Sequence, residues 1–303
     1  MRHHQTAILV FAGAMNKISH GIEWMVLIGA PAALVLLGII RMRWKHVAEA
    51  RRPFTEVPLR VAGQSTRQKA DELFESATED LFFVLIGPAI GFLYGISPLR
   101  ESRVFGGVLF LVIAIVTGWL GLRLRTELRA SWNYRLGALG EQVVSRELDK
   151  LMRLDYRVFH DVPFDGWNID HVVLGAKGVF AVETKTWRKP RKESKLQAKV
   201  VFDGRGLIRP GKKSDPGAIE QARDNARSLS NWISKSAAEN VSVVPVVALP
   251  GWALEIMQYS DVAVFSATNM GEAMLSRGKS SLSPEQIQRI GFQLAKCCEE
   301  DGA

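Results

Sequence analysis

The spacing of apolar and polar residues divides the chain into two unlike parts. Nearly all of the long apolar runs lie before residue 123, whereas the rest alternates between short apolar runs and helical stripes. The long runs cover residues 22–40, 81–96 and 104–122. The third is the most uniform and is close to the roughly 20 residues that a bilayer requires. We therefore expect about three transmembrane helices in residues 1–122.

Basic residues indicate how these helices are oriented. Those that follow the first and third runs are Arg41, Arg43, Lys45, Arg123, Arg125 and Arg129. Because the cytoplasmic flanks of membrane helices are enriched in Lys and Arg, we expect both flanks to be cytoplasmic. The alternative interpretation is that the apolar runs are buried helices of a soluble protein.

Two other segments of this first part have no such clear pattern. Residues 6–15 are apolar but too short to span a bilayer, so they are either a cleaved or interfacial segment or a flank of the next helix. Residues 41–80 have mixed charge and form the expected cytoplasmic linker. Ser65 is placed to cap a helix that ends at Asp80, and we expect no chemistry in this linker.

Residues 123–303 have the pattern of an α/β domain. An apolar stripe predicts a helix over 136–152, and Gly137 and Gly140 near its start permit close backbone approach. Glu141 lies in the first turn, where it either only complements the helix dipole or contributes a third acid to a site. The pattern further predicts strands at 156–162, 199–202, 206–209, 241–249 and 262–265, a turn at 163–167, and helices at 215–234, 270–275 and 284–298.

The most informative stretch covers residues 168–187. Two apolar runs flank a Gly-Ala-Lys-Gly turn, which predicts a β-hairpin. If residues 175–178 form a four-residue loop, the register follows by counting outward along both strands. The expected pairs are Leu174–Val179, Val172–Ala181, Asp170–Glu183 and Asn168–Lys185.

This register gathers charged groups on one face of the hairpin. Directly opposed residues have their side chains on the same face, and the two-residue period of a strand adds Lys185 to the face of Asp170 and Glu183. The other face is also largely apolar, so we expect a sheet that is covered on both sides. His171 belongs to that other face, which favours a structural or hydrogen-bonding role for it.

The charged cluster favours chemistry on phosphate esters. Two opposed carboxylates repel each other unless a cation lies between them, and Asp170 and Glu183 are hard oxygen ligands that suit Mg²⁺ or Mn²⁺. Such a metal acts as a Lewis acid and generates a nucleophile from water, which Lys185 would orient or assist. The sequence has no glycine-rich phosphate loop, zinc-ligand set or serine triad that competes with this interpretation.

Overall charge favours an anionic partner. The chain carries a net charge of +8 and has a pI near 9.6. The basic residues that directly follow the hairpin are Arg188, Lys189, Arg191, Lys192 and Lys195. They form either a solvated face or a surface for the phosphate backbone of nucleic acid. The two cysteines, Cys297 and Cys298, are adjacent, so we expect no structural disulfide.

Short motifs in residues 136–266 form a specific combination. They are Leu139-Gly140-Glu141, Ile169-Asp170-His171-Val172-Val173, Gly178-Val179-Phe180, Val182-Glu183-Thr184-Lys185, Pro216, Gln221-Ala222, Asn225 and Val244-Pro245-Val246-Val247. In this order they resemble the nuclease-related domain called NERD, within the PD-(D/E)XK nuclease-like superfamily. The resemblance covers somewhat under half of the chain.

The resemblance implies an α/β fold with a restriction-endonuclease-like αβββαβ core, in which helices flank a mixed central sheet. We expect this core to lie within a cytoplasmic domain of residues 123–303. It implies a site made of Glu141, Asp170, Glu183, Lys185 and Gln221, with Asp170 and Glu183 as metal ligands. It also implies DNA cleavage that depends on Mg²⁺ or Mn²⁺.

Three functional hypotheses follow from these observations. The first is a membrane-anchored, metal-dependent nuclease, multi-pass in the inner membrane of a bacterium, with DNA and the lipid bilayer as partners. The second is a non-catalytic module that binds nucleic acid or another partner and is tethered to the membrane. The third is a membrane assembly or stress protein in which the nuclease fold serves as a scaffold.

Overall fold

The computed structural model describes residues 59–96, 103–164, 166–189, 199–268, 270–278 and 280–299, and side chains from these ranges except at 87–106. The predicted span at 22–40, the segment 6–15 and the first part of the linker lie outside the described residues. The chain divides into two compact units. One comprises Met1–Glu56 and Leu85–Val116, and the other comprises Val57–Val84 and Thr117–Ala303. The second unit contains the residues of the predicted site.

Within the described ranges, two long helices come before the sheet. Helix α2 covers Gln64–Ile96, so the predicted helix end at Asp80 is wrong. The helix continues because no Gly or Pro interrupts the chain between Ser65 and Ile86. Helix α3 covers Arg103–Leu148 and joins the third apolar run to the helix predicted over 136–152. A short 3₁₀ turn, Asp149–Leu154, follows α3 directly.

The described residues contain one helical stretch, Gly107–Leu154, that is long and apolar enough to cross a membrane. None of its apolar window is buried against other described residues. Exposed apolar side chains of this stretch include Phe110, Leu111, Ile115 and Trp119. Such exposure differs from that of the core helix of a soluble protein, which buries its apolar residues.

The central sheet has five strands in the order β1-β2-β3-β6-β8. Their bounds are β1 Arg157–Phe164, β2 Trp167–Gly175, β3 Gly178–Thr184, β6 Val243–Leu249 and β8 Ala263–Ser266. The first three pair antiparallel, whereas β6 is parallel to β3 and β8 is parallel to β6. This mixed sheet, with α3 before it and α4 between β3 and β6, confirms the predicted αβββαβ core.

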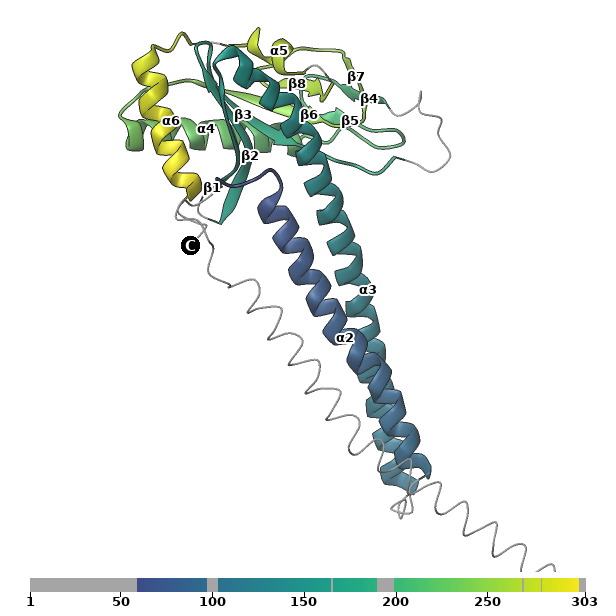
Figure 1. Cartoon of the computed structure of the whole chain (residues 1–303). Coiled ribbons are helices and arrows are strands. Elements are labelled where there is room, and N and C mark those ends of the chain that lie inside the picture. The colour runs from purple at the N-terminus through teal and green to yellow at the C-terminus, as the bar shows by residue number, and fades with distance from the viewer. Residues whose placement is uncertain are drawn as a thin grey trace, which may run out of the picture. The chain divides into compact units, whose positions relative to one another are not determined.

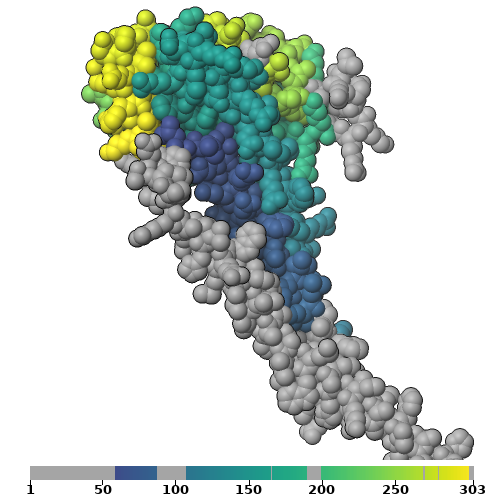
Figure 2. Space-filling model, viewed as in Figure 1, coloured from purple at the N-terminus to yellow at the C-terminus, as the bar shows by residue number. Residues whose placement is uncertain are grey.

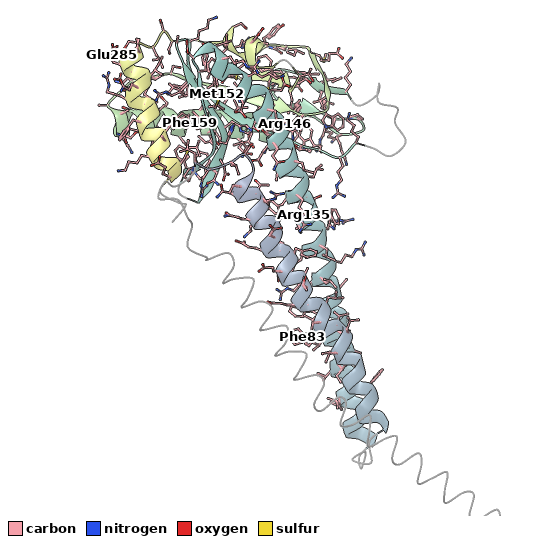
Figure 3. All side chains as sticks on the ribbon, viewed as in Figure 1. Phe83, Arg135, Arg146, Met152, Phe159 and Glu285 are labelled. Atoms are coloured by element: carbon pink, nitrogen blue, oxygen red, sulfur yellow. The ribbon has the colours of Figure 1, made fainter. Side chains whose placement is uncertain are left out.

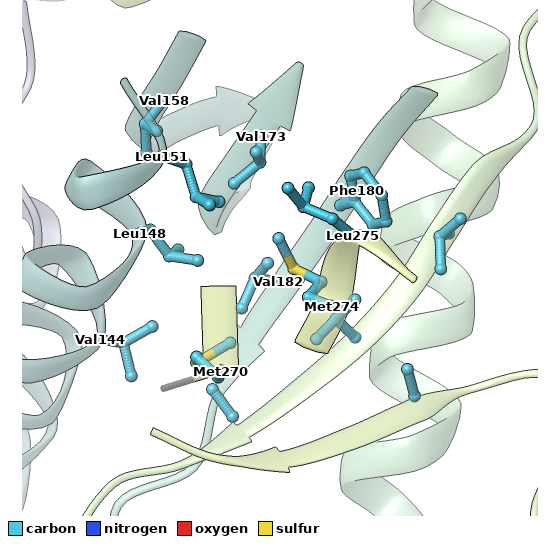
Figure 4. Packing of buried hydrophobic residues seen from close by; sticks show 14 of the residues in the cluster. Val144, Leu148, Leu151, Val158, Val173, Phe180, Val182, Met270, Met274 and Leu275 are labelled. Atoms are coloured by element: carbon cyan, nitrogen blue, oxygen red, sulfur yellow. The ribbon is translucent and has the colours of Figure 1, made fainter. Parts of the chain in front are cut away.

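Helices cover both faces of this sheet, as the apolar pattern on both faces of the hairpin predicted (Figure 1). On one face, α3 and α5 (Met270–Leu275) pack their apolar side chains against the strands. Figure 4 shows Val144 and Leu148 of α3 in the same core cluster as Val173, Phe180 and Val182 of the sheet. On the other face, α4 (Gly217–Ala237) and α6 (Pro284–Glu299) form a second core cluster with the strands.

A small second sheet has the order β5-β4-β7. The hairpin predicted around residues 203–204 is confirmed, with β4 at Lys199–Phe202 and β5 at Leu207–Ile208. Strand β7, Ala253–Ile256, was not predicted. Strand β7 is short and largely exposed, so it has no alternation of apolar and polar residues that would predict a strand. It forms through parallel pairing with β4, which is distant in sequence.

The connection between β1 and β2 is tighter than predicted. Strand β1 continues to Phe164 and β2 begins at Trp167, so both strands extend into the range 163–167 in which a turn was expected. Gly166 has a φ of +77°, which a residue with a side chain rarely adopts. The rings of Phe164 and Trp167, at the end of this hairpin, stack with their centroids 4.8 Å apart.

The start of α2 is bound to strand β1. Asp161 is almost fully buried. Its Oδ2 accepts a hydrogen bond from the Ser65 amide at 3.0 Å and forms an ion pair with the Arg60 guanidinium at 3.2 Å. The Ser65 hydroxyl also donates to Oδ1 of Asp161. Thus a distant carboxylate caps α2, in place of the predicted cap by Ser65 itself. Figure 2 shows the purple atoms at the start of α2 against the teal atoms of this domain.

Candidate active site

The β2–β3 register agrees with the prediction over the pairs that the ladder contains. Leu174 pairs with Val179, and Val172 pairs with Ala181. The ladder ends at the pair of His171 and Val182, one step before Asp170 and Glu183. Beyond that point the Thr184 amide donates to Oδ2 of Asp170 at 2.6 Å, which holds the two strand ends together.

Glu183 lies at the carboxyl end of β3, where it is buried with 3% of its surface exposed. Its Oε1 is 2.7 Å from Nζ of Lys185, and its Oε2 accepts a hydrogen bond from Nδ2 of Asn225 at 2.9 Å. The Lys185 ammonium also donates to Oε1 of Gln221 at 2.7 Å. Helix α4 therefore completes the environment of the Glu183–Lys185 pair with two amide side chains, at positions 221 and 225.

The surroundings of Asp170 shift the pKa of its carboxyl group. Burial raises its pKa well above the usual range, and the nearby charges of Glu183 and Glu141 raise it further. The Thr184 amide and the Lys185 ammonium act in the opposite direction. A cation bound among these acids would remove the repulsion and favour the ionised carboxylates.

Glu141 reaches the same cluster from α3. It is 5% exposed, and burial raises its pKa to about 7, against a hydrogen bond that lowers it. That bond comes from the Thr66 hydroxyl of α2, which donates to Oε1 at 2.8 Å. The charges of Asp161 and Glu183 also raise its pKa. The predicted position in a first turn is wrong, because α3 begins at Arg103 and Glu141 lies near its carboxyl end. A favourable dipole effect is therefore excluded, and the neighbours of Glu141 favour its interpretation as a third acid of the site.

The approach of α3 to β3 depends on a glycine, as the sequence indicated. A Cβ atom on Gly140 would lie 1.7 Å from Oγ1 of Thr186 and 2.8 Å from its Cβ, far inside contact distance. Only glycine therefore allows α3 to run this close to the chain that leaves β3. This approach brings Glu141 to Glu183 and Asp170.

His171 faces away from the acids, in agreement with its expected hydrogen-bonding role. It is fully buried, and its Nδ1 lies 2.9 Å from Nδ1 of His160. Its Nε2 lies 3.3 Å from Oγ1 of Thr184, and Nε2 of His160 lies 3.0 Å from Oδ1 of Asp149. Burial lowers the pKa of His171 well below its usual range, so the ring is neutral and links the strands.

The chemistry of the donor set fits a hard divalent cation. Among the residues that the structure describes, no three His, Cys, Asp or Glu side chains are grouped to hold a metal ion. Mg²⁺ does not require such a group, because it commonly binds through one or two carboxylates and keeps waters and substrate phosphates. Asp170 and Glu183 supply two carboxylates, and the carboxyl group of Glu141 is buried nearby.

The basic segment after the hairpin is described only in part. Arg188 and Lys189 are described, whereas Arg191, Lys192 and Lys195 lie outside the described residues. The Lys189 ammonium lies 5.8 Å from the ring centre of Trp252, and the Arg209 guanidinium lies 4.6 Å from that of Trp187. Each of these two cations thus contacts an indole ring, although the Trp252 ring itself is buried, at 3% exposed.

Two contributors to the site had no assigned role at the level of sequence. Asn225 belongs to the motifs that carry the resemblance, and its spacing of four from Gln221 places both on one helix face. That spacing was the available signal. Thr66 had no local signal, because its contact with Glu141 joins positions that are 75 residues apart.

Comparison with known protein families identifies the domain that carries this site. A search of curated proteins and a search of solved structures gave no match. Residues 136–250 match the family described as NERD, nuclease-related domain. This range includes helix α3 from before Glu141, the β1–β2–β3 meander, and α4 through to the end of β6. The chain therefore contains a nuclease-related domain of the NERD family, in agreement with the resemblance that its motifs indicated.

Proposed function

We propose that the chain is a membrane-anchored, divalent-metal-dependent nuclease that hydrolyses DNA phosphodiester bonds at the cytoplasmic face of a bacterial membrane. In this proposal Asp170 and Glu183 hold Mg²⁺ or Mn²⁺, and Glu141, Lys185 and Gln221 complete the catalytic site. Nuclease-related domains are typically metal-dependent, which supports this choice.

The observation that carries the proposal is the position of Lys185. Its ammonium lies 2.7 Å from a Glu183 oxygen and 2.7 Å from the Gln221 oxygen, at the edge of a buried acid cluster. A lysine with one quarter of its side chain exposed reaches both the acids and solvent. A phosphate group that enters from solvent therefore meets a cation and carboxylates within one site.

Each residue has a role that follows from its contacts. The bound cation would supply Lewis acidity and an activated water at the scissile phosphate. Lys185 offsets negative charge on the phosphate and orients the attacking water. Asn225 fixes the Glu183 carboxylate, and Gln221 fixes the Lys185 ammonium, so both groups are positioned before substrate binds. Glu141, with a pKa of about 7, is suited to exchange a proton near neutral pH.

Charge and hydropathy support the other parts of the proposal. The net charge of +8 and the basic residues Arg188 and Lys189, which follow Lys185 closely in the chain, favour a polyanionic partner. The exposed apolar helix within Gly107–Leu154 supports an anchor in the membrane. The proposal keeps the three spans at 22–40, 81–96 and 104–122, with basic flanks on the cytoplasmic side.

The test is DNA cleavage by the full chain in detergent micelles. We expect cleavage with Mg²⁺ or Mn²⁺ and none with a chelator. Glu183→Ala and Lys185→Ala should each lower the rate by at least about 100-fold, as loss of one group that stabilises the transition state commonly does. Lys177→Ala is the matched control, because Lys177 is exposed at the opposite end of the same hairpin. Cleavage that persists in both site variants would refute the assigned site.

One observation favours the second hypothesis, a tethered binding module without catalysis. Both oxygens of Glu183 are already engaged, one by Lys185 and one by Asn225. A metal ion must therefore compete with the Lys185 ammonium for Oε1. If this pair does not open, the full chain should bind DNA in a salt-sensitive manner, show no cleavage with either metal, and lose binding when Arg188 and Lys189 are replaced by alanine.

A further inference from the structure

A pocket of about 390 Å³ lies next to the candidate site. Its wall includes Asp170, so the pocket and the acid cluster share a residue. The other side chains come from the first turns of α2, from α3 and from the end of the β1–β2 hairpin. They are Ser65, Thr66, Lys69, Tyr134, Phe164, Trp167 and Asn168. The volume is within the range of roughly 300–1,000 Å³ that ligand sites occupy.

The aromatic side of this pocket, Phe164 and Trp167, is supported by helix α4. Phe164 and Trp167 stack with centroids 4.8 Å apart and an angle of 19° between the rings. Phe164 in turn meets the edge of Trp232 of α4 at 6.3 Å, and it packs against the core cluster on that face. Trp167, the outer ring, keeps 37% of its surface exposed. A stacking surface is thus fixed before any ligand arrives.

The remaining groups of the pocket match the other parts of a nucleotide. Lys69 is exposed and pairs only at the surface with Glu72, so it contributes a cation for a phosphate. Nδ2 of Asn168 donates to Asp161, which leaves the Asn168 carbonyl oxygen as an acceptor for the edge of a base. A fully paired duplex presents no free base face to the indole, whereas an unpaired base does.

We infer that this pocket binds one unpaired nucleobase, stacked on Trp167, of a DNA strand whose phosphate lies at Asp170. The inference rests on the proposed function and makes it narrower, because it assigns single-stranded, gapped or frayed DNA as the substrate class. Continuous duplex is then the poorer ligand, since a base must first leave its partner to enter the pocket.

The inference is tested by binding of the full chain in detergent micelles with a chelator, so that cleavage does not interfere. The probes are two labelled duplexes with a single unpaired position, one that carries a base there and one that is abasic. We expect the chain to bind the base-bearing probe about 5-fold to 100-fold more tightly, which is the usual effect of one stacked base. Trp167→Ala should bring this ratio close to one.

Two further variants separate stacking from loss of folding. Trp167→Phe keeps an aromatic ring at the hairpin end and should preserve most of the binding ratio between the two probes. Trp167→Ala should unfold in the same transition as wild type, which shows that its loss of the ratio is not a loss of folding. Tyr259→Ala removes another exposed aromatic ring, between β7 and β8, and should leave the ratio unchanged. A wild-type ratio of one, or an equal ratio in wild type and Trp167→Ala, overturns the inference.

The outcome also distinguishes this inference from the proposed function. A base-dependent ratio without cleavage in Mg²⁺ or Mn²⁺ supports the pocket and refutes the nuclease. Cleavage with a binding ratio of one supports the nuclease and refutes the pocket.

Discussion

Replacement of Glu141 by glutamine should change how the stability of the chain depends on pH. The carboxyl has a pKa of about 7 in the fold, against 4.5 as the ordinary value, mainly because it is buried. Since the folded pKa lies above the unfolded one, the folded state keeps a proton that the unfolded state releases between these two pH values. Stability is therefore lost as pH rises from about 4.5 to about 7.

The size of this effect follows from the shift. One pKa unit corresponds to 1.36 kcal/mol, so a rise from 4.5 to about 7 gives roughly 3 kcal/mol of lost stability at pH 8. Glutamine is similar in shape, keeps an acceptor oxygen for the Thr66 hydroxyl, and does not ionise. The Glu141→Gln variant should therefore gain about 3 kcal/mol relative to wild type between pH 4.5 and pH 8.

The assay is urea unfolding of the full chain in mild detergent with a chelator, followed by tryptophan fluorescence at both pH values. Other groups titrate in the same range, so the informative quantity is the difference between variant and wild type. Glu220→Gln is the matched control, because Glu220 is exposed on α4 and its replacement should leave the wild-type profile unchanged. Parallel profiles for wild type and Glu141→Gln would show that the reasoning about this buried acid is wrong.

Three other substitutions test the contacts that build the site. Gly140→Ala should destabilise the fold by about 1–3 kcal/mol in urea unfolding, because its Cβ would meet Thr186, whereas Gly137→Ala one turn earlier makes only an ordinary contact at 3.4 Å. Asp161→Ala should cost about 3–5 kcal/mol, since it removes the buried carboxylate that pairs with Arg60 and caps α2, and proteolysis near residue 64 should become faster. Asn225→Asp should lower the cleavage rate by at least about 10-fold while Arg227→Ala does not, because a second carboxylate then faces Glu183. Unchanged values in any of these three variants would contradict the corresponding contact.

The sequence predicts the central hairpin well because strand pairing is a local matter there. A short glycine-bounded turn leaves one register, which the ladder follows as far as His171 and Val182. Extended by one step, that register predicts Asp170 beside Glu183 before any tertiary contact is considered. The helices α4, α5 and α6 follow from their apolar stripes for the same reason. Local periodicity therefore recovers the αβββαβ order of the domain.

Contacts between distant parts of the chain are not recoverable in this way. The cap on α2 comes from Asp161, 96 residues away from Ser65, and the donor to Glu141 comes from Thr66. No local sequence pattern links the Asp161 carboxylate to Ser65, or the Thr66 hydroxyl to Glu141. The two interactions also explain why the linker appeared to lack chemistry, since its role becomes visible only when α2 is docked on β1.

This docking has a consequence for how the domain should be studied. Residues 57–84 belong to the same compact unit as residues 117–303, and Ser131 and Arg135 of α3 bind Ala70 and Asp71 of α2. Figure 3 labels Arg135 on α3, on the stretch that runs beside α2. A soluble fragment that begins at residue 123 removes Thr66 and thus the hydroxyl that lowers the pKa of Glu141. Such a fragment would lose activity even if the full chain is a nuclease, so its inactivity is no argument against catalysis.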